Sequence, residues 1–182
     1  GQIQGFFDMP VDNLFTTPLF ARYIKKKLKN KKLICVSPDV GGVQRTRGLA
    51  TKIKADLAII DKRRPKPGKS QVMNIIGNVK GKTCIIVDDI IDSGGTIVNA
   101  VDALKKNGAN EVYVFITHAV LSGDAANKIR KSKIKKLVIT DTIDNSQKIK
   151  NNNKIEVLSI SSLMAEAIKR ISNSTSVSDL FN

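Results

Sequence analysis

The sequence predicts an α/β fold, with an open, mainly parallel sheet flanked by helices on both faces. Short apolar runs rich in Ile and Val alternate along the chain with segments of helical periodicity. The runs contain four or five residues, which suits strands that are buried on both faces of a parallel sheet. These runs are LICV (33–36), LAII (57–60), CIIV (84–87), VYVFI (112–116), KLVIT (136–140) and IEVL (155–158).

Three stretches carry the apolar spacing of amphipathic helices. The first begins at Thr17 and Pro18, where a capping residue precedes a first-turn proline. The second covers residues 94–107, and Gly108 follows it in a position typical of a helix C-terminus. The third covers residues 161–171. Strand and helix therefore alternate as they do in an open α/β sheet.

Two segments break this alternation. Residues 61–71, DKRRPKPGKSQ, combine two prolines and a glycine with five basic residues, which predicts a mobile, cationic loop. The N-terminal segment carries adjacent phenylalanines, Phe6 and Phe7, for which the chain offers no further strand or helix upstream to pack against. We therefore expect the chain to be a piece of a longer protein.

The composition excludes several classes of protein. A length of 182 residues with 41% hydrophobic residues fits one domain with its own core. Cys35 and Cys84 lie in apolar runs, which argues against a disulfide scaffold and for a cytoplasmic protein. No apolar stretch approaches the ~20 residues of a membrane span, so no membrane partner is expected.

The formal net charge of +15 has two interpretations. Most basic residues are lysines, and they cluster in runs such as 25–32 and 131–136. Specific nucleic-acid binding more often relies on arginines and aromatic residues along one surface. We interpret the surplus mainly as solvated surface and do not expect a nucleic-acid partner, although an RNA-binding protein built on this fold stays an alternative.

The strongest chemical signal is VDDIIDSGGT, residues 87–96. A buried strand is followed by acidic side chains, then by hydroxyls and glycines directly before a helix. Glycines let backbone N–H groups surround an anion, and the helix N-terminus adds its dipole. Carboxylates suit the vicinal hydroxyls of a sugar, so the segment can hold ribose 5-phosphate. The substrate-binding candidates are Asp88, Asp92, Ser93, Gly94, Gly95 and Thr96.

The motif VDDIIDSGGT resembles the phosphoribosyl-pyrophosphate (PRPP) binding motif of type I phosphoribosyltransferase folds. The segments SPDVGGVQRTR (37–47), IIDKRRPKPGKSQVMNIIG (59–77) and QIQGFFDMPVDNL (2–14) resemble the ribose-phosphate pyrophosphokinase family. This resemblance covers nearly the whole chain. It implies that residues 1–182 are the C-terminal, phosphoribosyltransferase-like domain of a longer two-domain enzyme, with a C-terminal tail at 174–182.

The resemblance also implies a reaction. The β,γ-diphosphoryl group of ATP would pass to the C1 hydroxyl of ribose 5-phosphate, giving PRPP and AMP for nucleotide biosynthesis. Lys62 and Arg64 match catalytic positions, and ATP is the co-substrate. Asp39 matches a Mg²⁺-binding aspartate, and Asp8 and Asp12 match weaker metal positions, for which capping or surface roles are equally open. We expect the isolated chain to turn over little.

Regulation and assembly follow from the same resemblance. Ser176, Ser178 and Phe181 match an effector site for phosphate and ADP, against the simpler interpretation of a frayed tail. The family forms dimers that assemble into hexamers. A base phosphoribosyltransferase and a catalytically silent regulatory subunit are the alternative functions. His118, the single histidine, receives no role.

Overall fold

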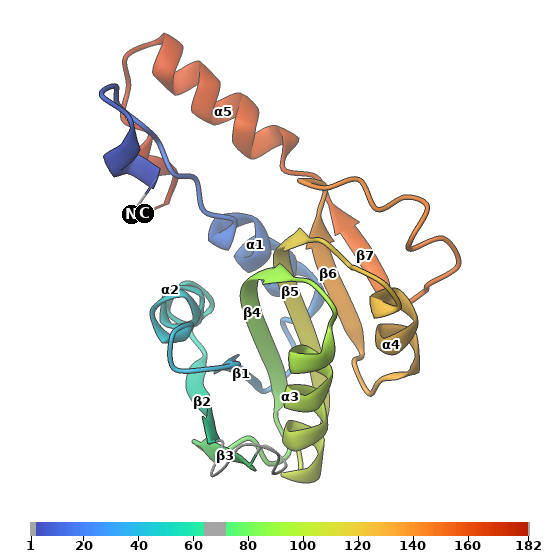
Figure 1. The fold of residues 1–182 in the computed structure, drawn as a ribbon. Helices are drawn as coiled ribbons and strands as arrows, with labels where there is room; N and C mark the ends of the chain where they lie inside the picture. Colours follow the sequence, from blue (N-terminus) through green and yellow to red (C-terminus); the bar gives the residue numbers. More distant parts are fainter. Residues whose placement is uncertain (1–2, 64–71, 182) are drawn as a thin grey trace.

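A computed structural model describes residues 3–63 and 72–181. These residues form a seven-stranded sheet in the order β3-β2-β1-β4-β5-β6-β7 (Figure 1). The strands are β1 (Leu33–Ser37), β2 (Asp56–Arg63), β3 (Val72–Ile76), β4 (Thr83–Ile91), β5 (Glu111–Ala119), β6 (Lys136–Thr140) and β7 (Ile155–Leu158). The helices are α1 (Thr17–Lys27), α2 (Val43–Ile53), α3 (Gly95–Lys106), α4 (Ala125–Lys131) and α5 (Ser161–Ser172), with 3-10 turns η1 (Ile3–Phe6) and η2 (Ser178–Leu180).

The sheet is parallel except at one edge, where β3 pairs antiparallel with β2. Successive residues of a strand point to opposite faces, and the core divides accordingly. Ile34 and Val36 of β1 belong to the cluster that contains α3 and α4, whereas Cys35 belongs to the cluster that contains α1 and α2. The predicted fold class, an open and mainly parallel sheet covered on both faces, is confirmed.

The two cysteines have the core positions that the sequence predicts. Cys35 and Cys84 are free thiols without exposed surface. Burial raises the pKa of each thiol to about 12, because the apolar surroundings disfavour the thiolate. A thiol that stays protonated at neutral pH is unreactive, so both residues act as packing groups.

Some sequence-based boundaries were wrong. The predicted loop at 61–71 begins too early, since Asp61, Lys62 and Arg63 continue β2 and pair with β3. The remainder of that loop, residues 64–71, lies outside the described residues. The first helix has Thr16 as its N-cap, one residue before the predicted cap at Thr17.

Three elements were absent from the prediction, namely β3, α2 and α4. The strand β3 is an edge strand whose Asn74 and Ile76 are exposed, so it lacks the continuous apolar run used to find the others. The helix α2 buries only Thr46, Leu49 and Ala50, and α4 is a seven-residue helix that buries two side chains.

The helix α5 leaves most of its apolar stripe uncovered. Ala167 is its one buried residue, whereas Ile168 is 61% exposed and Ile171 is 56% exposed. Figure 1 shows this helix extending away from the sheet, and nearby the C-terminal Phe181 packs edge-to-face on Phe15 with ring centroids 5.4 Å apart. Among the described residues, helices are too short or too polar to cross a lipid bilayer.

Candidate functional site

The candidate site lies at the edge where the parallel strands β1, β2, β4 and β5 end, which we call the carboxyl edge. In open α/β sheets this edge carries the ligand sites, because the connecting loops and helix N-termini meet there. The VDDIIDSGGT motif occupies it through the end of β4 and the start of α3. The order of strand, turn and helix that the sequence indicates is thus the order in the structure.

Asp88 and Asp89 lie inside β4 rather than after it, whereas Asp92 follows the strand. The strand continues to Ile91, and both Val87 and Ile91 are buried on either side of the acids. Asp88 is half-buried and Asp89 is exposed between these two anchors. Asp88 and Ile91 also pair with β5, so the carboxylates stand on a hydrogen-bonded strand and not on a loop.

The turn after β4 forms the cradle, by which we mean residues Ser93–Thr96. Gly94 is the N-cap of α3 and has a φ of 76°, in the left-handed region that glycine adopts without strain. No side chain in the described structure caps α3 at this point. The N–H groups of its first turn are therefore available to an anion, with the exposed Thr96 hydroxyl beside them.

Arg45 is a site residue that the sequence analysis missed. It projects from α2, donates from Nη1 to Asp88, and donates from Nη2 to Asp89 Oδ2 at 2.9 Å. One guanidinium thus spans two neighbouring carboxylates, a geometry that its planar fork of donors favours. Because 43 residues separate Arg45 from Asp88, only the fold brings the two together.

The environment changes the acidity of one of these carboxyls. Burial raises the pKa of Asp88 above its ordinary value of 3.8, and the Asp89 carboxylate adds to this effect. The Asp89 backbone N–H and Arg45 oppose the shift by stabilising the charged form. The net direction is upward, so Asp88 is a weaker acid than an exposed aspartate.

Asp39 lies in the turn between β1 and α2, also at the carboxyl edge. Its Oδ1 accepts a hydrogen bond from the Gly42 N–H at 2.9 Å, and Ser37 Oγ donates to its carbonyl at 2.6 Å. A Cβ on Gly42 would meet Ser37 Oγ at 3.0 Å, so the turn is closely packed there. The carboxylate thus organises this turn, while its possible role toward a metal stays a prediction.

A pocket of about 730 Å³ opens beside this turn. The pocket brings Asp12, Gly41 and Arg45 together with Ser178 and Phe181 of the C-terminal tail. The tail is held in place, since Arg170 Nη1 donates to the Ser176 carbonyl at 2.8 Å. Val177, Ser178 and Phe181 thus line a pocket beside the candidate site, and the choice between an effector site and a frayed tail stays a prediction.

Other candidate residues are not gathered at one point. Lys62 is half-buried near the end of β2, and Asp8 is exposed in the N-terminal segment. Arg64 lies outside the described residues. His118 Nδ1 lies 3.0 Å from Thr142 Oγ1, which joins the ends of neighbouring strands. The described part of the chain brings no three His, Cys, Asp or Glu side chains together as metal ligands.

The chain is similar to known proteins over most of its length. Residues 50–182 match the family described as the phosphoribosyl synthetase-associated domain. Over 182 residues the chain is 57% identical to the ribose-phosphate pyrophosphokinase of Bradyrhizobium diazoefficiens, and over 183 residues it is 56% identical to that of Hyphomonas neptunium. All of this chain is covered in both comparisons, but only 57% and 59% of the relatives.

A solved structure is similar over nearly the whole chain. The crystal structure of phosphoribosylpyrophosphate synthetase from Mycobacterium smegmatis superposes with a TM-score of 0.86 at 37% sequence identity. The match covers 95% of this chain and 56% of that protein. The chain therefore spans little more than half the length of the proteins it resembles.

Proposed function

Since the chain belongs to the phosphoribosyl synthetase-associated domain family, we propose that the protein containing it is a ribose-phosphate pyrophosphokinase. It transfers the β,γ-diphosphoryl group of ATP to the C1 hydroxyl of ribose 5-phosphate, giving PRPP and AMP. Residues 1–182 form its C-terminal, phosphoribosyltransferase-like domain. The observation that carries the proposal is the uncapped, glycine-led start of α3 directly beside the acids of β4.

The cradle and the acids divide the binding of ribose 5-phosphate between them. The backbone N–H groups and hydroxyls of Ser93–Thr96 hold the phosphate, supported by the positive end of the α3 dipole. Asp88 and Asp92 accept hydrogen bonds from the sugar hydroxyls. Arg45 already occupies Asp88, so the sugar either shares this carboxylate with Arg45 or displaces it.

Lys62 and Arg64 supply cations for the transfer step. Charge develops on the phosphate oxygens while the β-phosphorus moves from ATP to the sugar, and positive side chains stabilise that charge. Lys62 lies near the end of β2, and β2 runs parallel to β1. Lys62 therefore lies at the carboxyl edge, as Asp88 does. As the C1 oxygen bonds to the β-phosphorus, the bond from that phosphorus to the oxygen bridging the α- and β-phosphates breaks. AMP leaves with the bridging oxygen, and the hydroxyl proton passes to solvent water.

Magnesium is the proposed metal, and its protein ligands are drawn from Asp39, Asp8 and Asp12. No three ligand side chains gather in the described residues, so one or two carboxylates would share the ion with substrate oxygens. This is the usual arrangement for Mg²⁺, which keeps few protein ligands in phosphoryl-transfer sites. When bound, the ion neutralises charge on the phosphate chain.

Regulation, assembly and location complete the proposal. Phosphate and ADP act as effectors through Ser176, Ser178 and Phe181, and the second and third of these line the 730 Å³ pocket. The whole protein is a homo-oligomer, a dimer that assembles into a hexamer, and exposed apolar residues such as Ile168 support the need for a covering surface. Two free, buried cysteines support a cytoplasmic location.

The direct test uses the full-length protein with ATP and ribose 5-phosphate. We expect stoichiometric AMP and PRPP, and we expect Lys62→Ala to reduce kcat by about 100-fold or more, because one transition-state contact of this kind is worth about that much. Lys169→Ala, which removes an exposed lysine of α5, is the matched control and should leave the rate unchanged. Absence of AMP formation by the wild-type protein would contradict the proposal.

A second measurement tests the binding site in the 182-residue chain itself. Calorimetric titration with ribose 5-phosphate should show weak binding that Thr96→Val reduces by about tenfold, the usual effect of losing a hydrogen bond to a charged group. Thr175→Val, in the C-terminal tail, is the matched control. If both variants bind ribose 5-phosphate with the same affinity, the cradle is not its binding site.

A further inference from the structure

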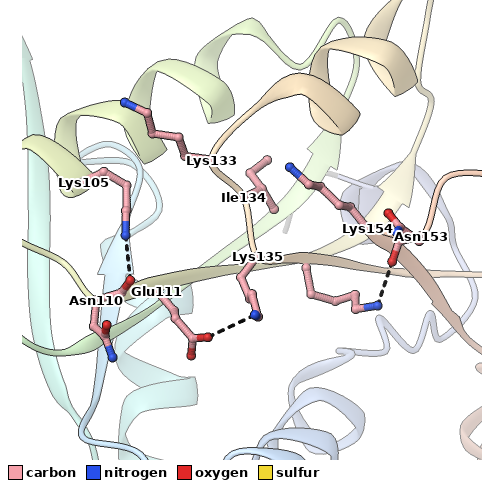
Figure 2. Close-up of a pocket in the computed structure, with 9 residues that line it drawn as sticks. Lys105, Asn110, Glu111, Lys133, Ile134, Lys135, Asn153 and Lys154 are labelled. Carbon is pink, nitrogen blue, oxygen red and sulfur yellow. Dashed lines mark hydrogen bonds and ion pairs between the residues drawn. The ribbon is translucent and has the colours of Figure 1, made fainter.

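A second pocket opens at the opposite side of the sheet, at the edge where β5, β6 and β7 begin, which we call the amino edge. Its volume is about 590 Å³, within the usual range of small-ligand sites. Figure 2 shows lysines from several elements arranged around it. The lining consists of Lys105, Asn110, Glu111, Lys133, Ile134, Lys135, Lys136, Asn153 and Lys154.

Three of the five lysines are held by backbone carbonyls. Lys105 Nζ donates to the Asn110 carbonyl at 2.7 Å, and Lys136 Nζ donates to the Asn153 carbonyl at 2.9 Å. Lys154 Nζ donates to the Ser132 carbonyl at 2.5 Å. A carbonyl orients an ammonium group without cancelling its charge, and an ammonium group has three donors. These lysines are therefore ordered and can still donate to an anion.

Carboxylates neutralise only part of this charge. Glu111 is the one acid in the lining, and it is shared between Lys31 and Lys135, the latter at 3.5 Å. The hydrogen bond from Lys31 is the main reason that the pKa of Glu111 lies below its usual range. Outside the lining, Asp102 lies 3.5 Å from Lys133 and Glu156 lies 4.0 Å from Lys136. The pocket keeps a positive excess.

We propose that this pocket binds a short chain of linked phosphates. The charge excess calls for a multiply charged anion, and the volume accommodates one of that size. The lining contains no aromatic and no arginine side chain, the groups that usually stack on or read nucleobases. Recognition therefore rests on the phosphates alone. This site is separate from the cradle and does not depend on the proposed enzymatic function.

Tripolyphosphate, titrated calorimetrically into the 182-residue chain, tests the proposal. The double variant Lys105→Gln/Lys136→Gln removes two charges from the pocket and should weaken binding by about tenfold or more. Lys26→Gln/Lys169→Gln removes two charges at exposed positions outside the lining and is the matched control. Because the cradle is also expected to bind phosphate, titrations are made with saturating ribose 5-phosphate. Equal weakening in both double variants would overturn the proposal.

Glu111→Gln supplies a test of the opposite sign. Removal of the single carboxylate in the lining should tighten tripolyphosphate binding several-fold, an effect that a folding defect does not produce. Thermal unfolding of each variant checks that it folds. Unchanged or weaker binding by folded Glu111→Gln would contradict the proposal.

Two further ligands identify what is recognised. ATP carries the same phosphate chain, so it should show the same dependence on Lys105 and Lys136 as tripolyphosphate does. A dependence seen with ATP but not with tripolyphosphate would overturn the proposal, since the nucleoside would then be the recognised group. A single-stranded RNA oligonucleotide that binds more tightly than tripolyphosphate through the same lysines would also overturn it.

Discussion

The two edges of the sheet differ in how they arrange charge. At the carboxyl edge, Asp88 and Asp89 share a single arginine, and the start of α3 offers uncapped N–H groups. At the amino edge, five lysines surround one glutamate. One edge can therefore engage both hydroxyls and an anion, whereas the other is suited to anions alone.

Helix direction explains part of this difference. In a parallel α/β sheet the helix N-termini point to one edge and the C-termini to the other. Lys105 and Lys106 occupy the last turn of α3, where the helix dipole favours cations. Basic residues at the amino edge thus have a structural reason to be there. The helix dipole does not explain why these lysines surround a pocket and donate to backbone carbonyls.

Replacement of Gly94 should have the largest effect and should damage the carboxyl edge alone. Gly94→Val places a β-branched residue at a φ of 76°, which should lower the free energy of unfolding by about 2 kcal/mol. Gly95→Ala is the control, because a Cβ there meets open space and should not destabilise the protein. Urea denaturation measures both, and equal losses would show that the left-handed turn is not the cause.

Loss of Arg45 should have a smaller effect at the same edge. Arg45→Gln leaves Asp88 and Asp89 without their shared partner, and we expect a loss of about 1 kcal/mol, since the pair is partly exposed. Arg47→Gln, at an exposed position of the same helix, is the control. Combination with Asp88→Asn should cost less than the sum of the single losses, and strict additivity would argue against the pairing.

Asp88 at the carboxyl edge and Glu111 at the amino edge should make the free energy of unfolding depend on pH in opposite directions. Asp88 has a raised pKa, so its contribution is fully present below its ordinary value of 3.8 and is lost as the pH rises through the raised pKa. Glu111 has a lowered pKa, so its contribution is present above its ordinary value of 4.5 and is lost as the pH falls through the lowered pKa. NMR titration of the two carboxyl carbons measures both directions, and shifts of the same sign would remove this contrast.

Loss of a single amino-edge lysine should have the smallest effect. Lys135 is mostly exposed and lies 3.5 Å from Glu111, so Lys135→Gln should change the free energy of unfolding by less than about 0.5 kcal/mol. Thermal and urea unfolding check this value. A loss comparable to that of Gly94→Val would show that the amino edge is required for folding rather than available for binding.

Sequence patterns located most of the sheet because its central strands are buried on both faces. Runs such as CIIV at 84–87 are continuous in the sequence and correspond to buried residues of β4. The same rule missed β3, whose residues alternate between partly covered and exposed positions at the edge of the sheet. Lys62 was assigned to a loop because the prolines and basic residues that follow it outweighed the strand signal.

The candidate site could be predicted only where it is local in the sequence. Residues 88–96 are contiguous, and the acids that precede the Ser-Gly-Gly-Thr run are what predicts a phosphate- and sugar-binding segment there. The contacts of Arg45 with β4 and the packing of Phe181 on Phe15 join distant segments. No periodicity or local motif encodes such contacts, because they arise from how α2 and the tail pack.

The position of the acids between two buried anchors has a consequence for the entropy of binding. Val87 and Ile91 fix the backbone on both sides of Asp88, and Ile91 O also accepts hydrogen bonds from the N–H groups of Val120 and Leu121. The conformational freedom of this segment is therefore lost when the chain folds. A ligand that arrives later meets carboxylates whose backbone is already ordered, so its affinity is not reduced by ordering that backbone.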